Sequence, residues 1–142
     1  ELVERITEIW GMDEGNRFVV LTGGEPMLQV DQTLVDELKS KGFFIALETN
    51  GTQPIDVNVD WVCVSPKSGS KLVAKKGNEL KFVFPQDGIN PQDLLSLDFD
   101  EFYLQPMDNE FTDDNIKGVV DYCLKHPKWR LSYQIHKSIG ID

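Results

Sequence analysis

The sequence contains few cysteines, and this scarcity limits its metal and redox chemistry. Only Cys63 and Cys123 occur among the 142 residues, and neither belongs to a CxxC or CxxxCxxC pattern. An iron–sulfur cluster needs more thiolate ligands than two distant cysteines supply. We interpret both as small buried apolar residues, with a disulfide between them as the lesser alternative. Such a pair fits a reducing compartment, so a cytoplasmic location is expected.

Long apolar runs and positive charge are scarce as well. The apolar runs, such as Phe43–Leu47, have the length of strands and fall far short of the roughly 20 residues of a membrane span. Lys and Arg total 14 against 24 Asp and Glu, which gives a net charge of −10. This balance disfavours nonspecific binding to nucleic acid or to a membrane. A small anionic ligand is still compatible with it, because a local group of lysines or a helix N-terminus can attract an anion.

Helical and strand patterns alternate over residues 1–142, a length that suits a single domain. Apolar spacing and capping signals predict helices over Leu2–Trp10, Asp31–Lys41, Pro91–Leu97 and Thr112–Lys125, the last capped by Thr112 or Asp113. Short apolar runs predict buried strands at Phe18–Leu21, Phe43–Leu47, Trp61–Val64, Leu80–Phe84, Phe102–Leu104 and Leu131–Ile135. This order predicts an α/β fold with a mostly parallel sheet.

Polar or glycine-bearing segments follow five of these strands. They are Thr22–Pro26, Glu48–Thr52, Ser65–Gly69, Gln105–Asp108 and His136–Lys137. The C-terminal ends of parallel strands share one edge of the sheet, and ligands bind there in α/β proteins. The five segments are therefore expected to line one pocket.

The segment Thr22–Pro26 carries the most specific pattern. Gly23 and Gly24 allow the backbone to approach a ligand without a Cβ between them. The carboxylate of Glu25 suits charge-assisted hydrogen bonds from a cationic amine. The alternative is an ordinary Gly-Gly turn with a solvated Glu25.

Three other side chains suit a polar ligand. Lys67 is the cation best placed to meet a ligand carboxylate. The Glu48 carboxylate could accept hydrogen bonds from the N–H groups of a heterocyclic ring. His136 is a candidate hydrogen-bonding partner of a substrate. Alternatively, Lys67 lies in solvent, Glu48 bonds to neighbouring backbone, and His136 is packed or exposed. Ordinary turn chemistry is the alternative for Ser65–Lys67 and Gln105–Asp108.

These segments also resemble a known family. Leu21–Pro26 resembles the Gly-Gly-Glu motif of radical S-adenosylmethionine enzymes. Glu48–Thr52, Ser65–Lys67, Gln105–Asp108 and Gln134–Lys137, in this order, resemble segments of 7-carboxy-7-deazaguanine synthases. The resemblance implies a partial, open (β/α) barrel with a mostly parallel sheet.

The resemblance also implies residue roles. It assigns S-adenosylmethionine binding to Gly23, Gly24, Glu25, Ser65, Pro66, Lys67, Gln105, Pro106, Met107 and Asp108. It assigns substrate contacts to Thr22, Glu48, His136 and Asp142. It points to no catalytic acid or base and no metal ligand in this sequence.

The implied activity is a carbon–nitrogen lyase reaction that converts 6-carboxy-5,6,7,8-tetrahydropterin to 7-carboxy-7-deazaguanine for queuosine biosynthesis, a tRNA modification pathway. Its cofactors are S-adenosylmethionine, a [4Fe–4S] cluster and Mg²⁺. A homodimer and a reductant such as flavodoxin are the implied partners.

The family's cysteine loop is absent from residues 1–142, so we expect a truncated radical S-adenosylmethionine core that is inactive on its own. Loss of an initial strand would bare the edge at Phe18–Leu21, which favours pairing with a partner. The alternatives are another radical S-adenosylmethionine activating enzyme and a noncatalytic α/β binding module.

Overall fold

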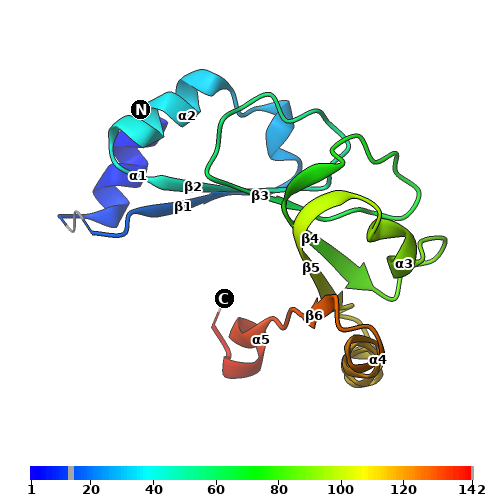
Figure 1. Cartoon of the computed structure of the whole chain (residues 1–142). Helices are drawn as coiled ribbons and strands as arrows, with labels where there is room; N and C mark the ends of the chain where they lie inside the picture. The colour runs from blue at the N-terminus through cyan, green and yellow to red at the C-terminus, as the bar shows by residue number, and fades with distance from the viewer. Residues whose placement is uncertain (13–14, 142) are drawn as a thin grey trace.

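A single six-stranded sheet forms the centre of the protein. The computed structural model describes residues 1–12 and 15–141, and all neighbouring strands in it run parallel in the order β1 to β6 (Figure 1). The strands are β1 (Phe18–Leu21), β2 (Phe44–Thr49), β3 (Trp61–Val64), β4 (Lys76–Phe84), β5 (Asp98–Pro106) and β6 (Trp129–Leu131). The expected α/β fold with an open parallel sheet is confirmed.

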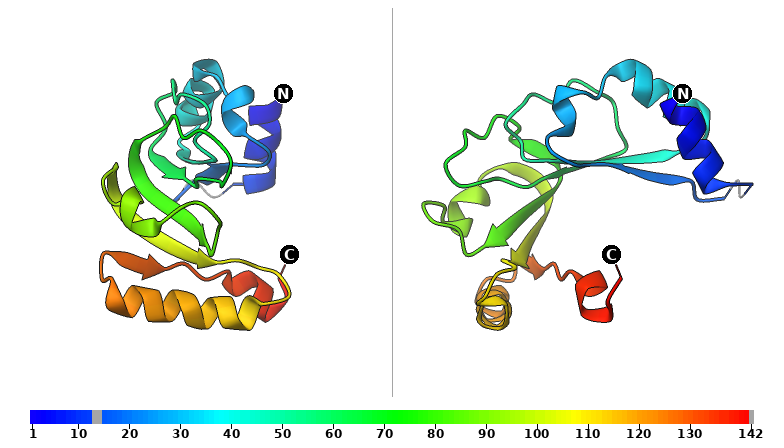
Figure 2. Two further views of the ribbon diagram at one scale, coloured as in Figure 1. Left: turned by 90° about the vertical axis from the view of Figure 1, so that its right-hand side faces the viewer. Right: turned by 180° about the vertical axis from the view of Figure 1, so that it is seen from behind.

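All the helices named here except α5 lie on one face of this curved sheet. The helices are α1 (Leu2–Trp10), the 3-10 helix η1 (Pro26–Leu28), α2 (Gln32–Ser40), α3 (Pro91–Leu94), α4 (Thr112–Lys125) and α5 (Ile135–Ile139). Figure 2 shows α1 and α2 outside the arch at one end of the sheet and α4 outside it at the other. The short helix α5 lies under the arch, on the concave side (Figure 1). Among the described residues, no helix has the length and apolar character needed to cross a bilayer.

Local signals explain where the predicted helices begin and end. The Asp31 carboxylate accepts a 2.8 Å hydrogen bond from Leu34 N at the start of α2, which satisfies a free backbone donor. Gly42, with φ of +79°, follows the end of that helix. Asn90 caps α3 through a 3.1 Å bond from Gln92 N.

Two apolar clusters fix the helices to the convex face. One, under α1 and α2, contains Val3, Val35, Leu38, Phe43 and Ile45. The other, under α3 and α4, includes Leu80, Phe82, Leu104, Val119 and Trp129. Burial of these side chains is the main stabilising contribution to the fold.

The prediction of a buried strand at Phe18–Leu21 is confirmed for the strand but wrong for its burial, because its concave face is uncovered. Phe18 and Val20 project to the uncovered side and are 48% and 40% exposed. Phe18 stacks on Phe44 of β2, with ring centroids 5.7 Å apart. The reason is that β1 forms one edge of the sheet and no helix covers its concave side.

The C-terminal strand is shorter than predicted, and Leu131–Ile135 is wrong as a strand. β6 ends at Leu131, and a last ladder bond of 2.8 Å runs from Ser132 N to Leu104 O. The chain then turns, and Ile135 begins α5. His136 and Lys137 therefore lie on a helix and not at a strand end.

Other boundaries also differ. α3 ends at Leu94 because the chain enters β5 at Asp98, so the helix predicted to Leu97 is too long. The N-cap of α4 is Phe111, because the Thr112 hydroxyl closes a turn with Asn109 and Thr112 is already helical. Three strands are longer than predicted, which places Glu48 inside β2 and Gln105 inside β5.

Candidate functional site

A pocket of about 240 Å³ lies at the C-terminal ends of strands β1 to β5. The residues that line it are Thr22, Gly23, Gly24, Glu48, Thr49, Asn50, Ser65, Lys67, Lys81, Val83, Gln105 and Gln134. Four of the five predicted segments therefore meet in one pocket. The fifth, His136–Lys137, does not line it, but Gln134, just before α5, does.

The loop after β1 offers bare backbone to this pocket. Gly23 has φ of +121°, a conformation that side chains disfavour. A Cβ built at Gly23 or Gly24 would have no other atom within 4 Å. The space beside both glycines is therefore open, as the sequence led us to expect for a loop that approaches a ligand.

Glu25 does not line the pocket, and its carboxylate bonds to its own chain. Its Oε1 accepts hydrogen bonds from Thr49 Oγ1 at 2.6 Å and from Met27 N at 3.1 Å. Its Oε2 accepts a bond from Asn50 N at 2.9 Å. We call the contacts of Glu25 with Thr49 and Asn50 the Glu25 clasp. It ties the glycine loop to the end of β2, so both oxygens are already engaged, and an amine contact stays a prediction.

Glu48 forms an ion pair with a residue that the sequence analysis missed. Lys81 Nζ lies 3.0 Å from Glu48 Oε1, and the two side chains are 18% and 45% exposed. Burial lowers the pKa of Lys81, but Cys63 and the hydrogen bond and charge of Glu48 outweigh it and raise the pKa above its ordinary value. The sequence did contain a signal for this residue, because Lys81 is the single charged side chain in the otherwise apolar run Leu80–Phe84.

Cys63 lies on β3 between the strands that carry this pair. Burial raises the pKa of its thiol far above the ordinary value; Lys81 opposes this effect and Glu79 reinforces it. The thiol is therefore protonated and unreactive at neutral pH. Both cysteines are free, which rules out the disulfide, and Cys63 is buried as expected. Cys123, on α4, is only half-buried.

The segment after β3 contributes a hydroxyl and a cation. Ser65 and Lys67 line the pocket, and Lys67 is exposed. Ser65 N donates a 2.8 Å hydrogen bond to Thr49 O, which extends the β2–β3 ladder. Pro66 is buried and does not line the pocket.

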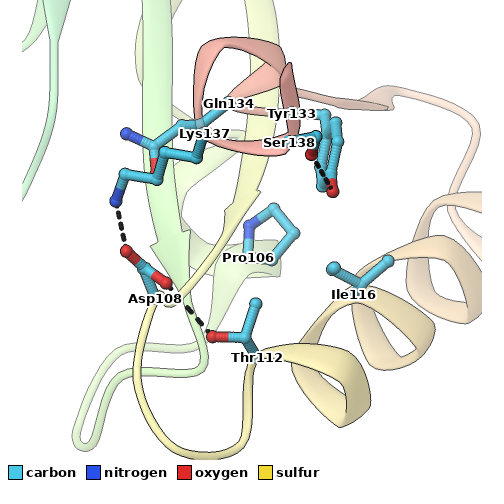
Figure 3. Close-up of a pocket in the computed structure, with 8 residues that line it drawn as sticks. All are labelled: Pro106, Asp108, Thr112, Ile116, Tyr133, Gln134, Lys137 and Ser138. Atoms are coloured by element: carbon cyan, nitrogen blue, oxygen red, sulfur yellow. Dashed lines mark hydrogen bonds and ion pairs between the residues drawn. The ribbon is translucent and has the colours of Figure 1, made fainter. Parts of the chain in front are cut away.

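The segment Gln105–Asp108 is divided between two cavities. Gln105 lines the main pocket, whereas Pro106 and Asp108 line a second hollow of about 220 Å³ between α4 and α5 (Figure 3). The second hollow is also lined by Thr112, Ile116, Tyr133, Gln134, Lys137 and Ser138. Met107 lines neither cavity; its N donates to Phe84 O at 2.8 Å.

An ion pair closes one side of the second hollow. Lys137 Nζ contacts the Asp108 carboxylate, and Thr112 Oγ1 lies 3.2 Å from Asp108 Oδ1 (Figure 3). The hydrogen bonds from Lys137 and Thr112 hold the pKa of Asp108 below its ordinary value. His136 is exposed and lines neither cavity. Asp142 lies outside the described residues.

No family model matches the sequence. Two curated proteins and one solved structure that resemble it belong to one enzyme family. The chain is 54% identical over 140 residues to a 7-carboxy-7-deazaguanine synthase from Burkholderia multivorans and 52% identical over 141 residues to one from Bradyrhizobium diazoefficiens. Each match covers 99% of this chain and 67% of the relative. The crystal structure of QueE from Escherichia coli superposes with a TM-score of 0.74 at 31% identity, covering 94% of this chain and 62% of that one. The chain belongs to the 7-carboxy-7-deazaguanine synthase family.

Proposed function

We propose that this chain forms the cofactor- and substrate-binding part of an enzyme that converts 6-carboxy-5,6,7,8-tetrahydropterin to 7-carboxy-7-deazaguanine in the cytoplasm. The observation that carries the proposal is the meeting of Thr22–Gly24, Glu48, Ser65, Lys67 and Gln105 in one pocket. Membership of the family supports the proposal, since the matched relatives are named 7-carboxy-7-deazaguanine synthases.

The pocket residues fit the polar end of S-adenosylmethionine. The backbone of Gly23 and Gly24 is open to a ligand, which suits an ammonium group that needs carbonyl acceptors. Lys67 and Ser65 line the same pocket and would hold a carboxylate. When bound, S-adenosylmethionine with a [4Fe–4S] cluster and Mg²⁺ would supply radical chemistry, which the protein orients and shields.

The residues present do not fit the cluster itself. Cys63 is buried in β3, and Cys123 lies on α4, which packs outside the convex face. Within residues 1–12 and 15–141, no three His, Cys, Asp or Glu side chains gather to hold a metal. No step through the cluster follows from this chain, and we expect residues 1–142 alone not to turn over substrate.

Glu48 and Thr22 are the proposed substrate contacts inside the pocket. A carboxylate beside open space suits the N–H groups of a pterin ring. His136 and Asp142 stay predicted contacts, because the first lies outside the pocket wall and the second outside the described residues. A homodimer and a flavodoxin-type reductant complete the proposal.

The test uses protein expressed from its complete reading frame under anaerobic conditions. Incubated with a reductant, S-adenosylmethionine and 6-carboxytetrahydropterin, it should release 7-carboxy-7-deazaguanine, detected by mass spectrometry. The Glu48→Gln variant should lose most of this product, whereas Glu37→Gln, an exposed carboxylate change on α2, should not. Cleavage of S-adenosylmethionine without the deazaguanine would instead indicate another radical reaction and reject the proposed substrate.

A further inference from the structure

The ion pair between Lys81 and Glu48 spans three strands. Glu48 lies on β2 and Lys81 on β4, and Cys63 of the intervening β3 is the register partner of both Glu48 and Glu79. Nζ and Oε1 are 3.0 Å apart, and both side chains line the pocket. Two strands of one rigid sheet therefore fix the separation of this cation and this anion.

Lys81 is the more firmly held member of the pair. Its side chain is 18% exposed, whereas that of Glu48 is 45% exposed. A lysine so far withdrawn from water needs a charged or hydrogen-bonding partner. Lys81 thus determines where the Glu48 carboxylate lies, and the outer part of Glu48 still reaches solvent.

The pair leaves hydrogen-bonding capacity unused. A lysine ammonium carries three N–H donors, and the bond found here uses one of them, toward Glu48 Oε1. Among the residues that the structure describes, no group donates to Glu48 Oε2. The pocket therefore presents an N–H donor beside a charged acceptor.

We propose that Lys81 is a specificity-determining residue that recognises, together with Glu48, a ligand edge in which a carbonyl lies beside an N–H group. A 2-amino-4-oxopteridine has such an edge: its 4-oxo group would accept from Lys81, and its ring N–H would donate to Glu48. This inference rests on the proposed function, which makes a pterin the ligand. The inference adds Lys81 as the residue that selects a ring with a 4-oxo group.

A simple change of ligand isolates the contact with Lys81. In a 2-amino-4-thioxopteridine a sulfur, which is a weak acceptor, replaces the carbonyl oxygen beside the ammonium, and the ring N–H that faces Glu48 is kept. An unpaired donor in a pocket built for hydrogen bonding weakens binding substantially. We expect the native protein to bind the 4-oxo ring at least about tenfold more tightly than the 4-thioxo ring.

The experiment measures this preference by calorimetry at pH 7.5. Protein from the complete reading frame, with S-adenosylmethionine and without reductant, is titrated with 6-carboxypterin and with its 4-thioxo counterpart. Lys81→Met should reduce the preference to about twofold or less, because the donor is gone, and Lys81→Arg should retain most of it. Lys76→Met, an exposed lysine change at the other end of β4, should behave as the native protein.

The possible outcomes separate the two claims. If Lys81→Met weakens both ligands equally and keeps the preference, Lys81 is merely structural and the inference is overturned. If that variant does not fold by circular dichroism, Lys81→Leu, which also removes the N–H donors, takes its place with the same expected loss of preference. Native protein that binds neither pteridine contradicts the proposed function, whereas native protein that binds both equally contradicts only the assignment of Lys81.

Discussion

The Thr49 hydroxyl donates a 2.6 Å hydrogen bond to the Glu25 carboxylate, and this bond joins the loop after β1 to the end of β2. Thr49 is 3% exposed and is the one buried polar side chain among the residues that the structure describes. Its Oγ1 also accepts a 3.1 Å bond from Gly51 N. The Glu25 clasp therefore connects two of the segments that line the pocket, even though Glu25 itself does not line it.

Replacing Thr49 by valine tests the clasp. The change removes one of three hydrogen bonds to a half-buried carboxylate and leaves the buried N–H of Gly51 without its partner, so we expect a loss of about 1–3 kcal/mol in unfolding free energy. Urea denaturation would measure it. Thr49→Ser keeps the hydroxyl and should cost clearly less. Equal stability of the native protein and Thr49→Val would show that the clasp contributes nothing.

Gly51 should resist substitution, in contrast to Gly118. Gly51 has φ of +74°, and an added Cβ would lie 2.7 Å from both Leu72 Cδ1 and Val64 Cγ1. Gly51→Ala should therefore destabilise the protein by roughly 1–3 kcal/mol, from strain and crowding together. Thermal unfolding monitored by circular dichroism is the measurement.

Gly118→Ala is the matched control for that substitution. Gly118 lies within α4, and an added Cβ would meet nothing within 4 Å. Because alanine favours the helix, this variant should gain about 0.5–1 kcal/mol. If both alanine variants shifted the melting temperature in the same direction, the described environment of Gly51 would be wrong.

The Asp108–Lys137 pair should give a pH dependence of stability. The pKa of Asp108 is lowered in the folded state by Lys137 and Thr112. Its stabilising contribution is therefore complete above the unfolded pKa of about 4 and is lost as the pH falls through the lower folded value. The melting temperature of native protein should exceed that of Asp108→Asn at pH 7, and the difference should shrink below pH about 4. A constant difference down to pH 2 would contradict this.

The two cysteines should differ in reactivity. The pKa of both thiols is raised by burial, but Cys63 is buried and Cys123 is only half-buried. Iodoacetamide at pH 8 should therefore modify Cys123 first and Cys63 only after denaturation, because the thiolate is the reactive form. Peptide mass spectrometry would assign the sites. Rapid labelling of Cys63 in folded protein would be inconsistent with its place in β3.

Local patterns were sufficient for much of the fold. The run Phe18–Leu21 and the run Trp61–Val64 match β1 and β3 at both ends, because each is a short apolar segment between turn residues. The pattern could not show that one face of β1 is uncovered, since burial depends on which helices cross the sheet. It also could not separate strand from helix around Ile135, where a short apolar run satisfies both.

The site was predictable at the level of segments and less so at the level of side chains. Parallel strand order was enough to bring Gly24, Glu48, Lys67 and Gln105 to one pocket. Lys81 lies 33 positions from Glu48 and two strands away from it. Glu25 lies 24 and 25 positions from its partners Thr49 and Asn50, at the end of the neighbouring strand. Such pairings follow from register, which single-sequence patterns do not fix.

The central claim is that the pocket at the ends of β1 to β5 holds the cofactor and the pterin together. The most direct test is a crystal structure of protein from the complete reading frame with S-adenosylmethionine and 6-carboxypterin. We predict density for a methionyl group between Gly24 and Lys67 and for a pteridine ring against Glu48 and Lys81. Ligands found instead in the hollow between Pro106 and Lys137, with the main pocket empty, would contradict the account.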